Sequence, residues 1–219
     1  MSMVKRVYVE KKPGFRVEAE GLLEELRDNL NLEALASVRV LHRYDLENLS
    51  EETYRRAVRR VLSEAPVDDV YEEEAVFSPQ DFVFAVEYLP GQYDQRADSA
   101  VQCIQILEAE EKPKVNYAKV YALTGSLTEE EKQAVKDYCI NTVDSREAAL
   151  GKPETLEMHY GVPADVAIVE GFREKSEEEI EKMRKDLGLA MSQADLLHTQ
   201  RYFRDTEHRD PSITEIRVL

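Results

Sequence analysis

The chain opens with an alternating apolar run, residues 4–11, and a similar run follows at 82–89. β-Branched and aromatic residues dominate both runs, which is typical of strands. Each run is followed closely by Pro-Gly, at Pro13-Gly14 and at Pro90-Gly91. Proline ends a strand ladder and glycine adopts backbone angles that other residues avoid, so we expect a turn at each place.

Helical periodicity follows each turn, and then strand periodicity returns. Further strands are predicted around Val38–His42 and Val115–Tyr121, each followed by a second helix. Thr128 and Glu131 form a capping-box pattern at the start of the last of these helices. The expected core-facing stripes are Leu22, Leu23, Leu26 and Leu30; Tyr54, Ala57, Val58, Val61 and Leu62; Ala100, Cys103 and Leu107; and Ala134, Val135, Tyr138 and Cys139.

These elements repeat at an interval of 77 residues. Matching residues include Val9, Glu10, Pro13 and Gly14 with Val86, Glu87, Pro90 and Gly91, and Val38, Tyr44 and Leu46 with Val115, Tyr121 and Leu123. With one deletion, Val67-Asp68 corresponds to Val143-Asp144. The first unit adds a third strand around Val67–Phe77, whereas the second lacks an obvious adjacent equivalent, for which the later run Asp165–Glu170 is a candidate. The two repeats, at about 1–77 and 78–150, predict an α+β domain that resembles a homodimer fused into one chain. The repeats pair with each other either within one chain or between two chains.

The chain has two cysteines, Cys103 and Cys139, and no Cys-x-x-Cys motif. This usage is typical of a reduced compartment and indicates no disulfide framework. In the repeat, Cys103 corresponds to Leu26 and Cys139 to Leu62. We therefore expect both thiols on core-facing stripes as small hydrophobes, with a reactive thiol as the alternative.

The two units differ most directly after the Pro-Gly turn. The first continues with Phe15–Glu20 and the second with the strongly polar run Gln92–Ser99. One interpretation is an ordinary capped turn with Asp94 as the helix N-cap. The other is a contact loop, because a helix start favours anions and polar partners and Gly91 permits close approach.

Residues 151–219 lie outside the repeat and are predicted to be mainly helical. Helices are expected at about Glu177–Leu187 and Gln193–Arg204, the first with a capping box at its start. Another capping box, formed by Ser212 and Glu215, begins a helix that has made barely one turn at Leu219. We therefore expect the reading frame to continue beyond this residue.

Charge and motifs restrict the function. The net charge of −16 disfavours nucleic acid and anionic membranes as partners. The N-terminus does not have the pattern of a signal peptide, and no apolar run is long enough to span a bilayer. We find no phosphate-binding glycine motif and no nucleophile motif, so no catalytic residue is assigned. The histidines lack metal-ligand spacing, so no metal site is expected: His42, His159, His198 and His208.

The phrases VYVEKKPG, VRVLHRYDLENLS, LPGQYDQRADSAVQC and INTVDSREA resemble PurS-like sequences, and GLAMSQADLLHTQRYFRDTEHRDPSITEIRVL resembles a linker that leads into a synthetase domain. PurS is the small subunit of formylglycinamide ribonucleotide amidotransferase. The tandem arrangement is similar to the N-terminal region of its large, single-chain form, phosphoribosylformylglycinamidine synthase. The resemblance implies tandem PurS-like β-α-β-α-β units in a pseudo-dimeric antiparallel-sheet/helix sandwich at 1–150, with a linker region at 151–219.

The resemblance also implies a function. The family is a cytoplasmic, ATP- and glutamine-dependent ligase of purine biosynthesis, and its PurS-like region bridges the synthetase and glutaminase domains and helps ammonia pass between them. These two domains are the expected partners, ATP and magnesium belong to the full enzyme, and this segment alone is expected to bind no cofactor and to be inactive. The residues expected at the interdomain contact or ammonia path are Pro90, Gly91, Gln92, Tyr93, Asp94, Gln95, Arg96, Asp98 and Ser99.

Two other classes of function remain open. The first is a stand-alone, non-catalytic interaction or regulatory α/β module that binds a partner through Gln92–Ser99. The second, an independent small enzyme, is the weakest, because it needs a nucleophile with a base or a cluster of ligands, and neither is visible.

Overall fold

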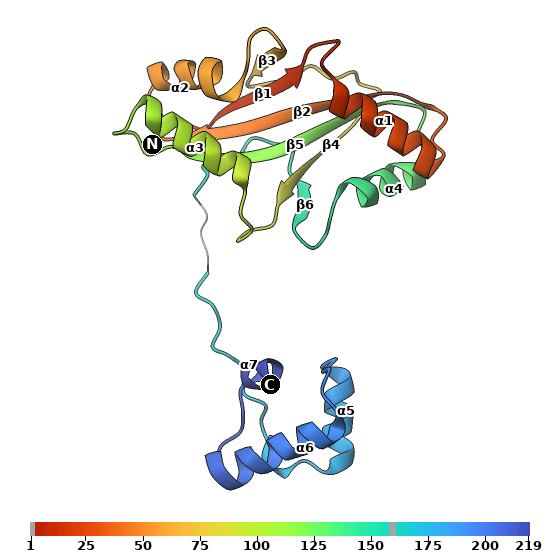
Figure 1. The fold of residues 1–219 in the computed structure, drawn as a ribbon, viewed down its shortest axis with the longest axis vertical. Helices are drawn as coiled ribbons and strands as arrows, with labels where there is room; N and C mark the ends of the chain where they lie inside the picture. Colours follow the sequence, from red (N-terminus) through yellow and green to blue (C-terminus); the bar gives the residue numbers. More distant parts are fainter. Residues whose placement is uncertain (1–2, 158–160) are drawn as a thin grey trace. The chain divides into compact units, whose positions relative to one another are not determined.

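The structure is a computed structural model that describes residues 3–157 and 161–219, and the chain divides into two compact units, Met1–Met158 and His159–Leu219. The first unit is α+β, and its described strands form one antiparallel six-stranded sheet in the order β3-β1-β2-β5-β4-β6 (Figure 1). The strands are β1 (Lys5–Lys11), β2 (Leu35–Glu47), β3 (Asp68–Glu72), β4 (Phe82–Tyr88), β5 (Lys114–Gly125) and β6 (Ser145–Ala148). The helices of this unit are α1 (Val17–Leu30), α2 (Glu51–Ala57) with the π-helical turn Val58–Leu62, α3 (Gln95–Leu107) and α4 (Glu129–Cys139).

Strands β2 and β5 pair antiparallel at the centre of the sheet. Within this pair His42 lies opposite Lys119, which is also the residue 77 positions later in the chain. The outer strand pairs are related by the same 77 residues. Val9 of β1 pairs with Val70 of β3, and the residues 77 positions later, Val86 of β4 and Glu147 of β6, also pair with each other. The two halves of the sheet therefore have the same pairing register about the position of His42 and Lys119.

The third strand of the second half corrects two sequence predictions. It follows α4 directly, as β6, and is not supplied by Asp165–Glu170, which lies in the second unit. The backbone N–H of Leu89 donates to the Asp144 carbonyl, as Lys12 donates to the Val67 carbonyl, both at 2.8 Å. Asp144 and not Val143 therefore corresponds to Val67, and no deletion is needed. The deletion rested on matching Val143, whose side chain is exposed.

The four described helices of the first unit pack on one face of the sheet, in two groups. In one group α1 and α4 cover Val40, Phe84 and Leu123. In the other group α2, its π-helical turn and α3 cover Val7 and Leu46. Each group combines one helix from the first half of the chain with one from the second, so apolar burial ties the two halves together.

Helix α3 lies one residue out of phase with the 77-residue repeat. Its buried residues Ala97 and Ile104 correspond to Ala19 and Leu26 of α1 at an interval of 78. The prediction that Cys103 faces the core is therefore wrong, because Ile104 takes that place and the Cys103 thiol is exposed. Cys139 is partly buried against the α1–α4 core, as expected.

The opposite face of the sheet contains buried charge. Arg6, Arg43 and Asp45 are each at most 5% exposed. Arg6 donates to the carbonyls of Leu150 and Gly151, and Arg43 donates to that of Ala149. Further along, Glu47 accepts hydrogen bonds from Thr155 and from the Leu156 amide. These contacts hold the chain that follows β6, including the first residues of the predicted linker region, against the sheet.

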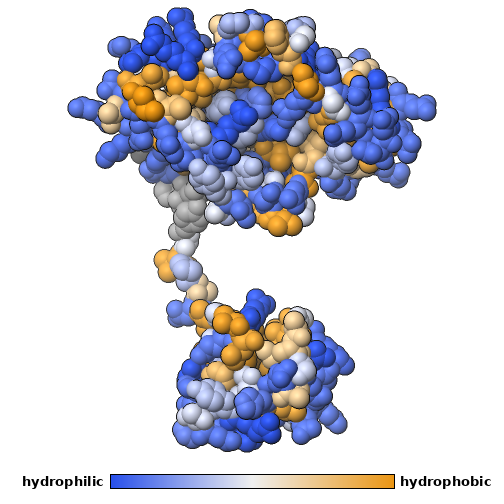
Figure 2. All heavy atoms as spheres, in the orientation of Figure 1, coloured by the Kyte–Doolittle hydropathy of each residue, from blue (hydrophilic) through white to orange (hydrophobic). Residues whose placement is uncertain are grey.

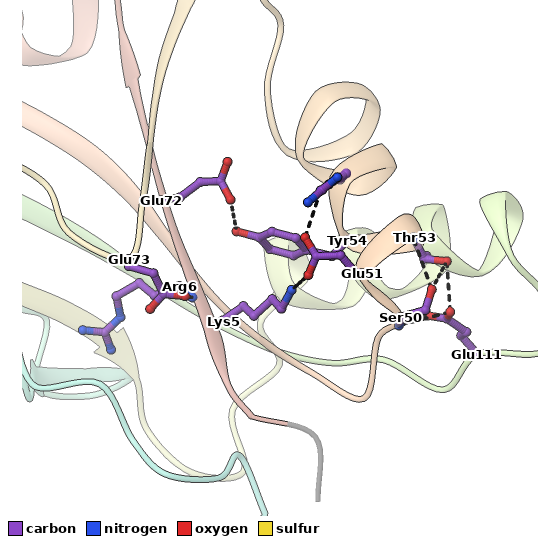
Figure 3. Close-up of polar contacts among 10 residues, drawn as sticks. Lys5, Arg6, Ser50, Glu51, Thr53, Tyr54, Glu72, Glu73 and Glu111 are labelled. Atoms are coloured by element: carbon purple, nitrogen blue, oxygen red, sulfur yellow. Dashed lines mark hydrogen bonds and ion pairs between the residues drawn. The ribbon is translucent and has the colours of Figure 1, made fainter.

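Polar contacts also join α2 to neighbouring elements (Figure 3). The Tyr54 hydroxyl donates to the Glu72 carboxylate of β3 at 2.9 Å, and Lys5 of β1 bonds Glu51. At the helix start, Glu111 accepts hydrogen bonds from the Ser50 amide and the Thr53 hydroxyl. Because Glu111 precedes β5, this contact links the second half of the chain to a helix of the first half.

The second unit is helical, with a 3₁₀ turn at Phe172–Glu174, α5 (Glu177–Asp186), α6 (Gln193–Tyr202) with the π-helical turn Phe203–Glu207, and α7 (Ile213–Val218). The predicted capping boxes at Ser176 and Ser212 are present. Its core consists of Phe172, Ile180, Leu196, Phe203 and Ile216.

Figure 2 shows hydrophilic residues over much of the surface in view, in keeping with the net charge of −16, with hydrophobic residues between them.

Candidate functional site: a polar cleft between two helix starts

The run Gln92–Ser99 forms a turn followed by the first residues of α3. Gly91 has φ 91°, in the left-handed region that a β-carbon disfavours. Asp94 is the N-cap of α3, since its carboxylate accepts from the amides of Arg96 and Ala97 at 3.0 and 2.9 Å. The capped-turn interpretation is therefore confirmed for the backbone, and it leaves the side chains of Gln95, Arg96 and Ser99 free to face other groups.

These three side chains line a cleft of about 550 Å³ on the helix face of the sheet. A cavity of this size accommodates a small molecule or several side chains. The other lining residues come from α1 and from the strands: Glu18, His42, Tyr88, Tyr117 and Lys119. Since His42 and Lys119 are the central residues of the β2–β5 pair, the cleft lies over the middle of the repeated register.

The starts of α1 and α3 contribute corresponding residues of opposite charge to the cleft. Glu18 and Arg96 are separated by the same 78 residues that relate the buried positions of the two helices. The turn before α3 therefore contains one more residue than the turn before α1. The exposed aromatics Phe15 and Tyr93 follow the same interval, with exposed fractions of 51% and 68%.

Arg96 lies over an aromatic surface at one side of the cleft. Its guanidinium carbon is 5.3 Å from the centroid of the Tyr117 ring, which is a cation–π distance, and its Nη1 donates to the Tyr44 hydroxyl at 3.3 Å. The Tyr117 hydroxyl lies 2.7 Å from Nδ1 of His42. Burial and the nearby Arg96 charge lower the pKa of His42 to about 4, so the imidazole is neutral at pH 7.

Lys119 and Glu18 form an ion pair at the other side. Their Nζ and Oε1 atoms are 2.6 Å apart, and Glu18 Oε2 lies 3.9 Å from His42 Nε2. Burial alone favours the protonated carboxyl of Glu18, but the hydrogen bond and charge of Lys119 outweigh it and lower its pKa. The cleft therefore contains two cations and one carboxylate at neutral pH.

The structure brings only part of the predicted contact run to the cleft. Gln95, Arg96 and Ser99 line it, whereas the lining does not include residues 90–94 or Asp98. Asp98 instead accepts from the Tyr93 hydroxyl at 2.8 Å, which steadies the exposed aromatic ring. The residues that sequence reasoning did not assign to a site are Glu18, His42, Tyr88, Tyr117 and Lys119.

The described parts of the chain contain no group of three or more His, Cys, Asp or Glu side chains that could hold a metal ion. His159 lies outside the described residues. None of the described helices is both long and apolar enough to cross a membrane.

No protein-family model matches the chain, and no curated protein matches it.

Proposed function

We propose that this chain is the N-terminal part of a large-form phosphoribosylformylglycinamidine synthase and acts there as a non-catalytic scaffold. In this proposal the first unit is a tandem pair of PurS-like units, and the second belongs to the linker that leads into the synthetase domain. ATP and magnesium bind elsewhere in the enzyme, which is cytoplasmic. The resemblance of the chain's segments to PurS-like and linker sequences supports this assignment.

The observation that carries the proposal is the pairing of His42 with Lys119 at the interval of the sequence repeat. A pair of residues at one repeat interval, lying opposite each other, is the arrangement expected when two like units meet about an approximate twofold axis within one chain. It supports the tandem, pseudo-dimeric form over a single unit. The equal β1–β3 and β4–β6 registers support the same conclusion.

The first test is to sequence the source gene beyond the codon for Leu219 and to assay the product of the full reading frame. We expect a synthetase body that opens with a Trp-Ser-x-His-Cys-type segment. We also expect ATP-dependent amidine formation with either glutamine or ammonium as the nitrogen source. A stop codon directly after Leu219 would overturn the proposal and leave the stand-alone interaction module, in which Gln92–Ser99 binds a separate partner.

The second test concerns the role of Gln92–Ser99 in interdomain contact and ammonia transfer. In the full enzyme, Arg96→Ala should lower the glutamine-dependent rate more than the ammonium-dependent rate, because only the former needs coupling between domains. Arg55→Ala, at an exposed arginine of α2, is the matched control. If both rates stay intact in Arg96→Ala, this role is wrong, whatever the reading frame shows.

A further inference from the structure

We infer that the cleft between the starts of α1 and α3 binds a small anion, a phosphate or carboxylate group, through Arg96 and Lys119. This inference concerns this chain alone and holds whether or not the chain belongs to an amidotransferase. It rests on the shape of the site, on the hydrogen bonds its charged groups already make, and on the other donors that face it.

The acidic groups around the cleft are already engaged. The carboxylate of Asp94 accepts from two α3 amides. The carboxylate of Asp98 accepts from Tyr93 and Gln102, and that of Glu18 accepts from Lys119. These hydrogen bonds engage one oxygen of each carboxylate, so the negative charge of all three groups is partly compensated within the protein.

The basic groups, in contrast, have donors to spare. Within the described residues, Arg96 makes one hydrogen bond, to the Tyr44 hydroxyl, out of five N–H groups. Lys119 makes one, to Glu18, out of three. The cation–π contact between the guanidinium carbon and the Tyr117 ring, at 5.3 Å, uses none of these N–H groups as hydrogen-bond donors.

Neutral donors complete the site. The Gln95 amide and the hydroxyls of Ser99 and Tyr88 line the same cleft and make no side-chain hydrogen bond within the described part of the chain. A phosphate or carboxylate bound between Arg96 and Lys119 thus meets additional donors of the kind that bind oxygen anions. In a chain of net charge −16, the lining of this cleft has two cationic side chains, Arg96 and Lys119, against one carboxylate, Glu18.

The test is an NMR titration of the chain with inorganic phosphate at pH 7.5, with sodium chloride adjusted to hold the ionic strength constant. We expect saturable shifts of the backbone amides of Gln95, Arg96, Ser99 and Lys119, with a millimolar dissociation constant. Arg96→Gln should weaken binding at least tenfold, and Arg96→Lys, which keeps the charge, by less. Arg55→Gln is the control, because Arg55 is an exposed arginine of α2 that does not line the cleft.

A parallel titration with sodium acetate separates the two sources of the anion. Shifts with phosphate alone assign the site to a phosphate group, and comparable shifts with both assign it to a general oxyanion. Shifts spread over the surface lysines and arginines would overturn the inference. The same holds for equal weakening in Arg55→Gln and Arg96→Gln, or for no saturation with either anion. The readout is binding, so it is independent of any transfer of nitrogen.

Discussion

Arg6 holds the carboxylate of Asp45 with two hydrogen bonds, from Nε at 2.6 Å and from Nη2 at 2.8 Å, and both side chains are almost fully buried. The same guanidinium donates to the carbonyls of Leu150 and Gly151. One buried arginine therefore joins β1, β2 and the chain that covers the sheet. Such a pair is costly to break, because removing one partner leaves the other charge buried without compensation.

Asp45→Asn should lower the free energy of unfolding by roughly 3–5 kcal/mol, the usual cost of breaking a buried ion pair. Urea denaturation followed by circular dichroism measures it. Glu129→Gln is the control, since the Glu129–Lys132 pair is exposed and should leave the denaturation midpoint nearly unchanged. Equal midpoints for Asp45→Asn and the native chain would show that Arg6 is not held by this carboxylate.

The lowered pKa of His42 predicts a dependence of stability on pH. Its folded value of about 4 lies below the ordinary histidine value of 6.5, so between these values the unfolded chain binds a proton that the folded chain does not. The stability due to the neutral imidazole is full above pH 6.5 and is lost as the pH falls towards 4. Unfolding should therefore become easier in this window for the native chain than for His42→Gln, which does not titrate. An NMR titration that places the imidazole pKa near 6.5 would contradict this.

Two glycines should respond in opposite directions to the same substitution. Gly91 has φ 91°, so a β-carbon strains the turn, and Gly91→Ala should destabilise the fold by about 1 kcal/mol or more. Gly21 lies within α1, where a β-carbon meets no atom within 4 Å. Gly21→Ala should therefore stabilise by about 0.5–1 kcal/mol. Thermal unfolding of both variants checks the signs, and a shift in the same direction would rule out this backbone explanation.

The two thiols should differ in reactivity. Cys103 is exposed, whereas burial raises the pKa of the Cys139 thiol to about 11 and keeps it protonated. With a thiol-specific disulfide reagent at pH 8, we expect one fast and one slow phase whose rates differ at least tenfold. Cys103→Ser should remove the fast phase, and Cys139→Ser should leave it intact. Two phases of equal rate would contradict the placement of Cys139.

Much of the fold could be predicted because local signals and burial agree. The strand at residues 4–11, the capping boxes at Thr128 and Ser176 and the stripe of α2 all follow from period and capping chemistry. The strand β6 could not be found in this way. Of its four residues only Ala148 is buried, so it has no apolar alternation, and sheet pairing alone makes it a strand.

The site was harder to predict because it depends on a shift of one residue. The repeat at 77 placed Cys103 on the core-facing stripe of its helix, but the longer turn before α3 shifts the helix to an interval of 78 and places Arg96 in the cleft that Glu18 also lines. A signal for the cleft did exist in the sequence. His42 and Lys119 are polar residues in the inward phase of otherwise apolar strands, and such residues face either a partner or a cavity.

The pairing of His42 with Lys119 also bears on how this surface can evolve. In an assembly of two identical chains, a residue on the twofold axis always faces its own copy, so a lysine there would meet a lysine. A single covalent chain lifts that restriction, because the two positions are encoded separately and mutate independently. The neutral imidazole of His42 can then lie opposite the ammonium group of Lys119. A symmetric interface can in this way become an asymmetric polar binding site while the strand register stays the same.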